Sequence, residues 1–298
     1  MNIKKLAREE IDKTKWNSCV HYANNGNIFG YLWYLDNVAK EWEGLVEGDY
    51  ESVMPLIGRS KYLGVKELYQ PILVRESGIY SIHTLSQKRM KMFYDAIPKE
   101  YKLIDVHLNE HHQILETDFS EATLTSLKNH QLFLNKPYEE IAKSYTDSLN
   151  QRLAVANDRD FVLSNSLKPE KVVDFYKKHS KDRRDLDRRY HAYLRIMYNI
   201  LHRGWGGSSG VLDQEGNILA ISFFMYSHSK ATSLLFASSP EGERLGADVF
   251  LYDMMIRTKA DTQFILDFNM ADDFPLKFGA ETTFYQQFQV DHRKWGLF

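Results

Sequence analysis

The sequence predicts an α/β protein with two domains, each a mixed and mostly antiparallel sheet flanked by helices. The first observation is length, because 298 residues exceed the roughly 100 to 200 residues of a typical single domain. The second is periodicity: apolar residues recur every three to four positions in some stretches and every second position in others. The third is that the order of these elements is similar in the two halves of the chain.

Composition narrows the class of protein. Hydrophobic residues at 43% and aromatic residues at 13% indicate a folded chain. With 38 basic and 40 acidic residues, the net charge of -2 gives no general reason to expect nucleic acid or an anionic membrane as a partner. One cysteine, Cys19, excludes an internal disulfide and fits a reducing compartment. No apolar run reaches the roughly 18 residues of a membrane span, and residues 1–15 lack a signal-peptide core, so we expect a cytoplasmic protein.

The first half begins with two expected helices, at 13–23 and 30–39, which an Asn-Asn-Gly-Asn break at 24–27 separates. A hairpin follows, because the strand patterns at 44–46 and 50–56 flank Glu-Gly-Asp. Further elements are expected as strands near 66–73, 79–82, 101–108 and 132–134, and as a helix at 86–97 with Ser86 as its N-cap.

A domain boundary is expected at Asn135-Lys136-Pro137, since proline suits the first turn of a helix. The predicted domains are therefore 1–136 and 137–298. In the second, we expect helices at 138–157, 168–179, 186–203 and 247–259, and strands at 161–164, 210–212, 218–226, 232–237, 264–268 and 283–290.

The later part of the second half has a distinctive order: a strand, a glycine-containing turn, a helix, a strand and then Lys277-Phe278-Gly279-Ala280. This order resembles the acyl-CoA N-acyltransferase (GNAT) fold. Two copies in one chain resemble the FemAB-type aminoacyltransferases, which carry tandem GNAT-like domains. The segments that carry this resemblance are 145–156, 212–222, 246–247 and 266–268. The first half, with Trp33-Tyr34-Leu35-Asp36 and Gly48-Asp49-Tyr50, resembles an uncharacterised bacterial group of GNAT-like proteins.

The resemblance implies a donor site in the turn after the fourth strand, where GNAT enzymes hold the cofactor pyrophosphate on backbone amides. The implied residues are Ala237, Ser238, Ser239, Arg244, Gly246 and Ala247, with acyl-CoA as co-substrate. The turn departs from the family pattern, because Gly242 and Gly246 are four positions apart instead of two. Glu241 and Glu243 also place negative charge where a phosphate would bind. An ordinary strand-to-helix turn is the alternative.

Acyl transfer to an amine requires a base and groups that stabilise an oxyanion. Asp267 and Asn269 alternate on a strand, so they share one face and can present a carboxylate and a substrate-binding amide to a cleft. Lys277 resembles the lysine near the Phe-Gly segment of Fem-type enzymes. The position of the usual GNAT tyrosine holds Pro275, which leaves Tyr285 as a substitute. Structural roles for Asp267 and Lys277 are the alternatives.

Other candidates lie outside this stretch. Trp33 and Tyr34 either form the core of the first domain or line a substrate groove. His107, His111 and His112 lack the spacing of a metal site, so we expect no metal. The basic run 177–189 is either a solvated helix face or a contact for tRNA.

The predicted function is therefore an N-acyltransferase, which moves an acyl or aminoacyl group from CoA, a carrier protein or tRNA to an amine on a small molecule or peptide. The balanced charge makes tRNA the less favoured donor. The alternative is a non-catalytic GNAT-fold binding module that has lost its donor site.

Overall fold

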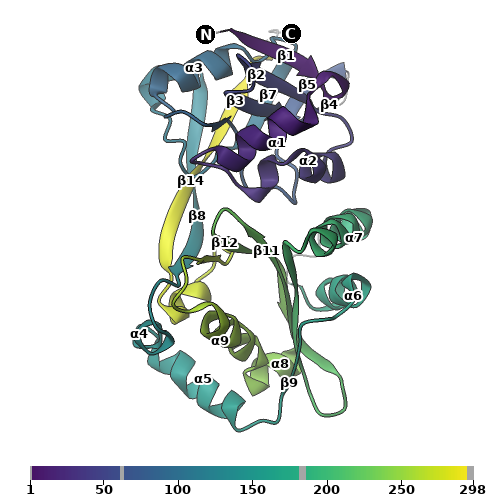
Figure 1. Cartoon of the computed structure of the whole chain (residues 1–298), viewed down its shortest axis with the longest axis vertical. Helices are drawn as coiled ribbons and strands as arrows, with labels where there is room; N and C mark the ends of the chain where they lie inside the picture. Colours follow the sequence, from purple (N-terminus) through teal and green to yellow (C-terminus); the bar gives the residue numbers. More distant parts are fainter. Residues whose placement is uncertain (1, 61–63, 181–185, 294–298) are drawn as a thin grey trace, which may run out of the picture. The chain divides into compact units, whose positions relative to one another are not determined.

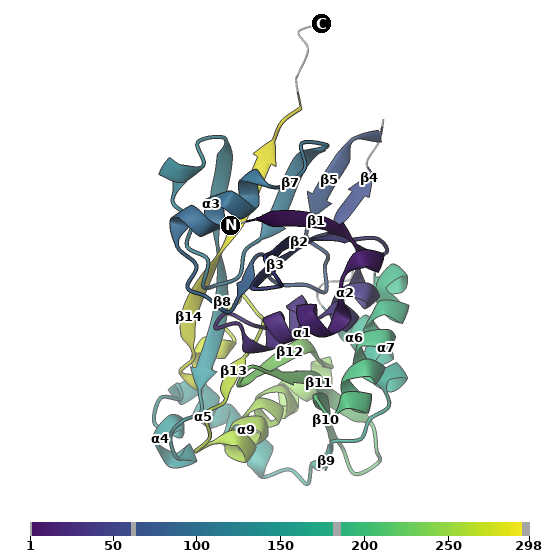
Figure 2. The ribbon, with the colours of Figure 1, turned by 45° about the horizontal axis from the view of Figure 1, so that its top comes forward.

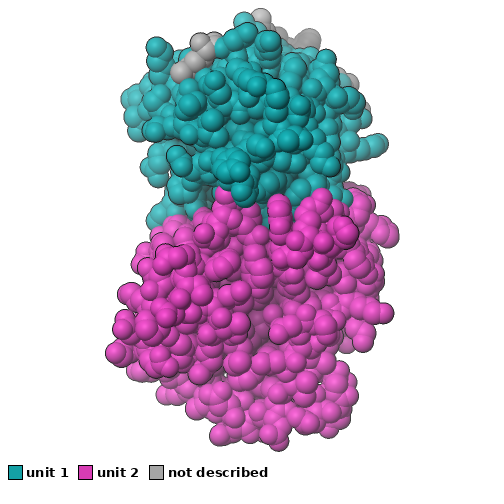
Figure 3. Space-filling model, viewed as in Figure 1, with its two compact units in different colours: residues 1–128, 284–298 teal, residues 129–283 magenta. Residues whose placement is uncertain are grey.

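A computed structural model describes residues 2–60, 64–180 and 186–293. The chain forms two compact units, which Figure 3 distinguishes by colour: unit 1 comprises residues 1–128 and 284–298, and unit 2 comprises 129–283. Two long strands, β8 (Ala122–Phe133) and β14 (Glu281–Asp291), have residues in both units. The boundary predicted after Lys136 lies beyond the first residues of unit 2, and residues 284–298 group with unit 1 instead of the second half.

Unit 1 contains two strand orders, β1-β2-β3-β6 and β4-β5-β7-β14-β8. β5 and β7 are parallel, whereas β14 and β7 are antiparallel, so the sheet is mixed as predicted. The strands are β1 (Ile3–Ala7), β2 (Glu43–Glu47), β3 (Ser52–Leu56), β4 (Gly58–Ser60), β5 (Lys66–Tyr69), β6 (Tyr80–Ser81) and β7 (Tyr101–His107). The helices are α1 (Lys13–Tyr22), α2 (Leu32–Val38) and α3 (Gln87–Asp95), labelled in Figure 1.

Local sequence explains where the helices of unit 1 begin. The Asp12 side chain accepts hydrogen bonds from the amides of Thr14 and Lys15 at the start of α1. The predicted cap of α3 is confirmed, because the Ser86 side chain accepts a hydrogen bond from the Arg89 amide. These caps satisfy amides that have no partner within the helix.

Unit 2 is organised around the order β8-β13-β12-β11-β10-β9, in which only β12 and β13 form a parallel pair among the pairings described. Its strands are β9 (Val162–Ser164), β10 (Gly206–Leu212), β11 (Ile218–Ser227), β12 (Lys230–Ser238) and β13 (Ile265–Asp267). Its helices are α4 (Tyr138–Ala142), α5 (Asp147–Asn157), α6 (Pro169–His179), α7 (Leu186–Arg203), α8 (Pro240–Leu245), α9 (Ala247–Lys259) and the short 3-10 helix η5 (Pro275–Phe278).

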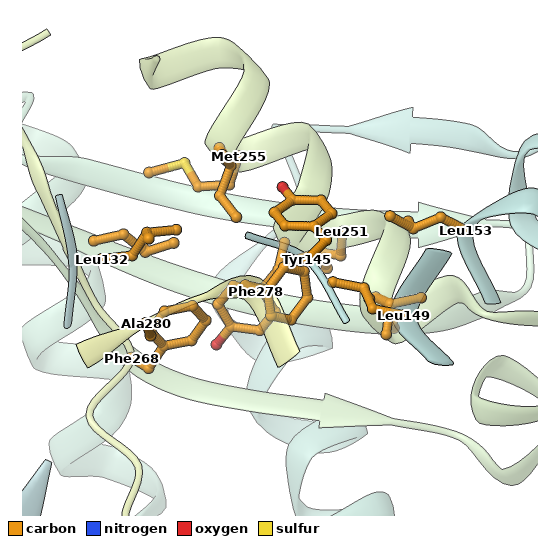
Figure 4. Close-up of a cluster of buried hydrophobic side chains, with 14 of the residues drawn as sticks. Leu132, Tyr145, Leu149, Leu153, Leu251, Met255, Phe268, Phe278 and Ala280 are labelled. Carbon is orange, nitrogen blue, oxygen red and sulfur yellow. The ribbon is translucent and has the colours of Figure 1, made fainter. Parts of the chain in front are cut away.

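Helices cover both faces of this sheet: α6 and α7 lie on one side and α9 on the other (Figures 1 and 2). Figure 4 shows part of the core between α5, α9 and the sheet, where Phe278 lies between Phe268 and Tyr145. All three rings are buried. None of the described helices is both long and apolar enough to cross a membrane.

Several elements differ from the sequence-based expectation: β1, β4 and α8 were not predicted, and two predicted elements have other bounds. The helix predicted over 138–157 is two helices, because Thr146 caps a new start and its side chain accepts a hydrogen bond from the Leu149 amide. Strand β8 begins at Ala122, far earlier than the predicted 132–134. Its first part is rich in polar residues and therefore lacks the apolar signal by which a strand is recognised.

Candidate functional site

The candidate site is a separation between two strands of unit 2, which we call the splay. β12 and β13 pair in parallel as far as Thr232 and Asp267, after which β12 continues to Ser238 paired with β11 but no longer with β13. The next amide, that of Ser239, donates to a carbonyl of β11 at 2.9 Å. Because successive residues of a strand direct their N–H groups to opposite edges, those of Ser238 and Phe236 are directed to the edge that β13 has left.

A buried polar cluster closes the narrow end of the splay. Asp267 is fully buried, and its Oδ1 accepts hydrogen bonds from Nδ2 of Asn129 and from the amide of Asn269, both at 3.0 Å. Asn269 has a left-handed backbone with φ of 54°, and its Nδ2 donates to the Ser233 carbonyl at 2.9 Å. The prediction that both residues alternate on one strand is wrong, because β13 ends at Asp267 and the left-handed Asn269 lies beyond it. The turn still brings the two residues together, and Asn129 from β8 joins them. The Oδ1 of Asn129 is buried and has no hydrogen-bond partner among the residues that the structure describes.

Beyond this cluster, aromatic rings pack over the splay on the face of the sheet that α9 covers. The Phe236 ring, on β12, stacks on Phe274 with centroids 5.4 Å apart and an angle of 25° between the planes. Tyr252, on α9, lies 5.0 Å from Phe236 and 5.0 Å from Phe268. Phe278 lies 5.4 Å from Phe274. The separated strands are therefore held by side chains where their backbones no longer pair.

Hydroxyl groups form a second layer behind the rings. The Tyr252 hydroxyl donates to Oγ of Ser233 at 3.3 Å, and the Oγ atoms of Ser222 and Ser233 are 3.2 Å apart. Here the pairing of β11 with β12 shifts register between Phe223 and Phe224, which marks a bulge. Burial raises the pKa of Tyr252 well above its ordinary value, so its hydroxyl remains protonated.

At the predicted donor turn, a side chain of the protein itself already binds a backbone amide at the start of α8. The Ser239 side chain accepts a hydrogen bond from the Gly242 amide at 3.0 Å, and Pro240 supplies no N–H. Arg244 is exposed and pairs with Glu241 at 3.2 Å. Ala237 and Ser238 are buried on β12. The first turn of α8 therefore offers few amides to a ligand.

The second glycine of the turn packs against α5. A Cβ on Gly246 would lie 2.9 Å from the Arg152 carbonyl oxygen, so glycine permits this close approach. At the start of α9, the Arg152 guanidinium donates to the Asp248 carboxylate at 2.6 Å and to the Glu243 carbonyl at 2.7 Å. Burial raises the pKa of Asp248, and the pairing with Arg152 opposes this shift. Ala247 is fully buried. A carboxylate of the chain itself thus occupies the start of this helix, and the turn does not fit the pyrophosphate of CoA.

The two remaining catalytic candidates belong to different units. Lys277, in η5 of unit 2, is half-buried, and its Nζ lies 5.9 Å from the centroid of the Phe274 ring, at the wide end of the splay. Tyr285 belongs to unit 1, where its ring lies 5.7 Å from that of His107. Within unit 2, the structure therefore groups Lys277 with the splay that also contains Asp267 and Asn269.

Trp33 and Tyr34 lie in the interior of unit 1, where both side chains are buried. Their rings meet edge to face at 5.4 Å, and the Tyr34 hydroxyl donates to the Leu73 carbonyl at 2.6 Å. These contacts are those of core residues. They show how the Trp33-Tyr34 sequence stabilises α2.

Unit 1 also contains a polar cavity of about 510 Å³. In its lining, Arg8 pairs with Asp36 at 2.7 Å, and the Trp42 indole donates to the same carboxylate at 2.9 Å. Tyr101 donates to Glu43 at 3.0 Å. The lining is therefore polar, and at least one pair of its charged groups, Arg8 and Asp36, neutralises itself.

Two other predicted features are the possible metal ligands and the basic run 177–189. Within the part of the chain that the structure describes, no cluster of histidine, cysteine, aspartate or glutamate could hold a metal ion. In the basic run, Lys177 pairs with Asp187. Arg183 and Arg184 lie outside the described residues.

The sequence did not reveal three residues of the splay: Asn129, Phe236 and Phe274. Asn129 lies 138 positions from its partner Asp267, so no local spacing connects them. The two phenylalanines look like ordinary core residues in the sequence. A weak signal for Phe274 was its position directly after Ala271-Asp272-Asp273, a polar stretch in which a buried ring is unexpected.

Comparisons with known proteins establish the fold. No protein-family model and no curated protein matches the sequence. Among solved structures, FemX is similar with a TM-score of 0.66 and 12% identity, over 96% of this chain and 97% of FemX. The C-terminal domain of a putative lysylphosphatidylglycerol synthetase from Agrobacterium fabrum has a TM-score of 0.56 and 11% identity, over 93% of this chain and 91% of that chain. A tandem GNAT protein from the clavulanic acid biosynthesis pathway has a TM-score of 0.52 and 8% identity, over 97% and 98%. The predicted tandem GNAT-like, FemAB-type fold is confirmed.

Proposed function

We propose that this protein is an acyltransferase that moves an acyl group from an activated donor to an amine at the splay of unit 2. The observation that carries this proposal is the free edge of β12, where the N–H groups of Phe236 and Ser238 lack a neighbouring strand. Similarity to a tandem GNAT protein supports the reaction class. The acceptor is an amine on a small molecule or peptide.

The free edge suits a donor with an extended, amide-containing arm. Such an arm binds a strand edge through main-chain hydrogen bonds, as an added strand does. Acyl-CoA has this arm and would supply a thioester, but the Gly246 turn does not fit its pyrophosphate. We therefore propose that the donor is held by its arm, which also allows a carrier-protein thioester or an aminoacyl ester of tRNA.

The chemistry follows from the polar cluster. The amine nitrogen attacks the carbonyl carbon, the new C–N bond forms, and the bond to the departing sulfur or oxygen breaks. Asp267, oriented by Asn129 and Asn269, accepts the proton that the nitrogen loses, and that proton then passes to the leaving group. N–H groups of the β12 edge stabilise the oxyanion, and the positive charge of Lys277 favours it from the wide end.

The test is a transfer assay with the full-length chain. Acetyl-CoA, an acyl carrier protein thioester and aminoacyl-tRNA are each incubated with a panel of primary amines, and amide products are detected by mass spectrometry. Asp267→Asn should lower the rate by about 100-fold or more, since general-base catalysis contributes that much. Asp273→Asn, a change at an exposed acid of the neighbouring segment, should leave the rate unchanged. The absence of product with every donor would refute the proposal.

A non-catalytic binding module is the second candidate function. Two observations favour it: the Asn269 bridge to Ser233 and the stacking of Phe236 on Phe274, which together fill the splay. The same assay separates the two functions. Saturable binding of a donor without any amide product supports the binding module.

A further inference from the structure

The Phe274 ring enters the splay from a surface segment. Residues Ala271, Asp272 and Asp273 are exposed, and Phe274 follows them as the first residue before η5. Its ring nevertheless contacts three rings of the splay, those of Phe236, Tyr252 and Phe278, at centroid distances of 5.4, 5.6 and 5.4 Å. Phe274 remains half-buried, whereas Tyr252 and Phe278 are fully buried. Phe274 is therefore the outer member of an otherwise internal cluster.

The chemistry of this space is apolar. Its walls are the faces and edges of Phe236, Tyr252, Phe268 and Phe278. The carboxylate of Asp267 lies at the narrow end, where Asn129 and Asn269 satisfy its Oδ1. A group that replaces the Phe274 ring would therefore meet aromatic carbon, which favours apolar and flat groups over charged ones.

The ring can leave without unfolding the chain. The Phe274 backbone is held independently, because its amide donates to Oδ1 of Asp272 at 3.1 Å and its carbonyl accepts from the Lys277 amide. Rotation about the side-chain bonds would move the ring towards solvent at the cost of its contacts with Phe236, Tyr252 and Phe278. No backbone pairing of β12 with β13 would have to break, since their ladder ends at Thr232 and Asp267.

We propose that the splay is a binding slot for an apolar acyl group, aromatic or of medium chain length, and that the Phe274 ring occupies this slot in the absence of donor. The proposal rests on the proposed acyltransferase function and deepens it, because it names the class of acyl group. If the slot is open in only a fraction of the molecules, the apparent affinity for the donor equals the intrinsic affinity multiplied by that fraction. Removing the ring should therefore strengthen binding selectively for apolar acyl groups.

The experiment compares Phe274→Ala with the full-length wild type and with Phe133→Ala. Phe133 is a matched control, because it is an exposed phenylalanine on β8 of the same unit. The probes are the acetyl and phenylacetyl thioesters of N-acetylcysteamine, which carry a thioester and an amide but no phosphate. Isothermal titration should show that Phe274→Ala binds the phenylacetyl thioester about tenfold more tightly than wild type, while the acetyl thioester changes little. Phe133→Ala should match wild type for both probes.

Two further results complete the test. If Phe274→Ala does not fold, Phe274→Leu, which shortens the plug but keeps an apolar side chain, should still bind the phenylacetyl probe more tightly than wild type. No gain in any folded variant, or an equal gain for both probes, overturns the slot. The transfer assay tests the proposed function separately. Tighter binding of the phenylacetyl probe without any amide product refutes the acyltransferase but leaves the slot intact. Transfer activity without tighter binding in Phe274→Ala refutes the slot alone.

Discussion

Both units contain a parallel strand pair, and the two pairs end differently. In unit 1, β5 and β7 pair in parallel, and the chain later returns so that Ser77 forms a further parallel bridge with Leu108. The Ser77 amide donates to the His107 carbonyl at 2.8 Å, and the Asn109 amide donates to the Ser77 carbonyl at 2.6 Å. In unit 2, β12 and β13 separate after Thr232 and Asp267, and side chains fill the space. Backbone hydrogen bonds thus extend the contact between β5 and β7, whereas side chains pack where β12 and β13 separate.

The side-chain contacts near the two parallel pairs also differ. Unit 1 has a directional polar network: Asn109 donates to the Asn25 carbonyl at 2.7 Å, and Asn25 Nδ2 lies 3.0 Å from Nε2 of His112. Unit 2 has stacked aromatic rings, whose contacts are individually weak and carry little directional constraint. Hydrogen bonds of buried polar groups are costly to break, whereas a ring at the surface of a cluster can rotate away. This difference is consistent with the proposed slot in unit 2, where a ring at the edge of the cluster is held by contacts with other rings.

The largest expected effect on stability distinguishes Phe278, in the core of unit 2, from Phe274, which is proposed to occupy the slot. Phe278→Ala should lower the free energy of unfolding by about 3 to 5 kcal/mol, because it leaves a cavity in a fully buried cluster. Phe274→Ala should cost only about 1 to 2 kcal/mol, because its ring is half-buried. Urea denaturation followed by circular dichroism measures both losses. Equal losses would show that Phe274 belongs to the rigid core.

The polar network of unit 1 should make stability depend on pH. Burial lowers the pKa of His112 from 6.5 to about 4, so the folded state binds its proton less readily than the unfolded state. The resulting stability is present above pH 6.5 and is lost as pH falls towards 4, by about 3 kcal/mol in total. Denaturation midpoints across this range provide the measurement.

The matched control for this pH dependence is His111→Asn, because the His111 side chain is exposed. The control should retain the loss of stability between pH 6.5 and pH 4, whereas His112→Asn should reduce it. The same slope in both variants would mean that other groups account for the pH dependence. The contrast between the polar network around His112 in unit 1 and the aromatic cluster around Phe274 in unit 2 would then lose its energetic basis.

The smallest effect concerns the Asn269 bridge across the splay. Asn269→Ala should cost about 1 to 2 kcal/mol, because it removes the bond to Ser233 and places a Cβ residue at φ of 54° without the local bonds that favour asparagine there. Asn269→Gly removes the same bond but tolerates this backbone, so it should cost less. Hydrogen exchange of the β12 amides should quicken in both variants. Unchanged exchange would show that the bridge does not hold the splay closed.

The sequence by itself determined the order of most helices and strands and the Ser86 cap, and its resemblance to known families indicated the tandem GNAT-like fold. The helices, strands and cap depend on periodicity and capping, which involve residues within about four positions of one another. Strands β1 and β4 and helix α8 were not predicted, and β8 was predicted too short because its polar first part carries no apolar alternation. The sequence also placed Asp267 and Asn269 on one strand, but the structure ends β13 at Asp267, and a left-handed turn at Asn269 brings their groups into one cluster.

Only the tertiary structure decided how the site is assembled. It placed Asn129 on Asp267 and packed Gly246 against Arg152. It also grouped Tyr285 with unit 1 and inserted Phe274 into the splay. Each of these outcomes depends on the packing of segments that are distant in sequence, about which a local pattern carries no information. A glycine or a phenylalanine can belong to a ligand site or to a core. Which of the two applies depends on the neighbouring side chains, and these are known only from the fold.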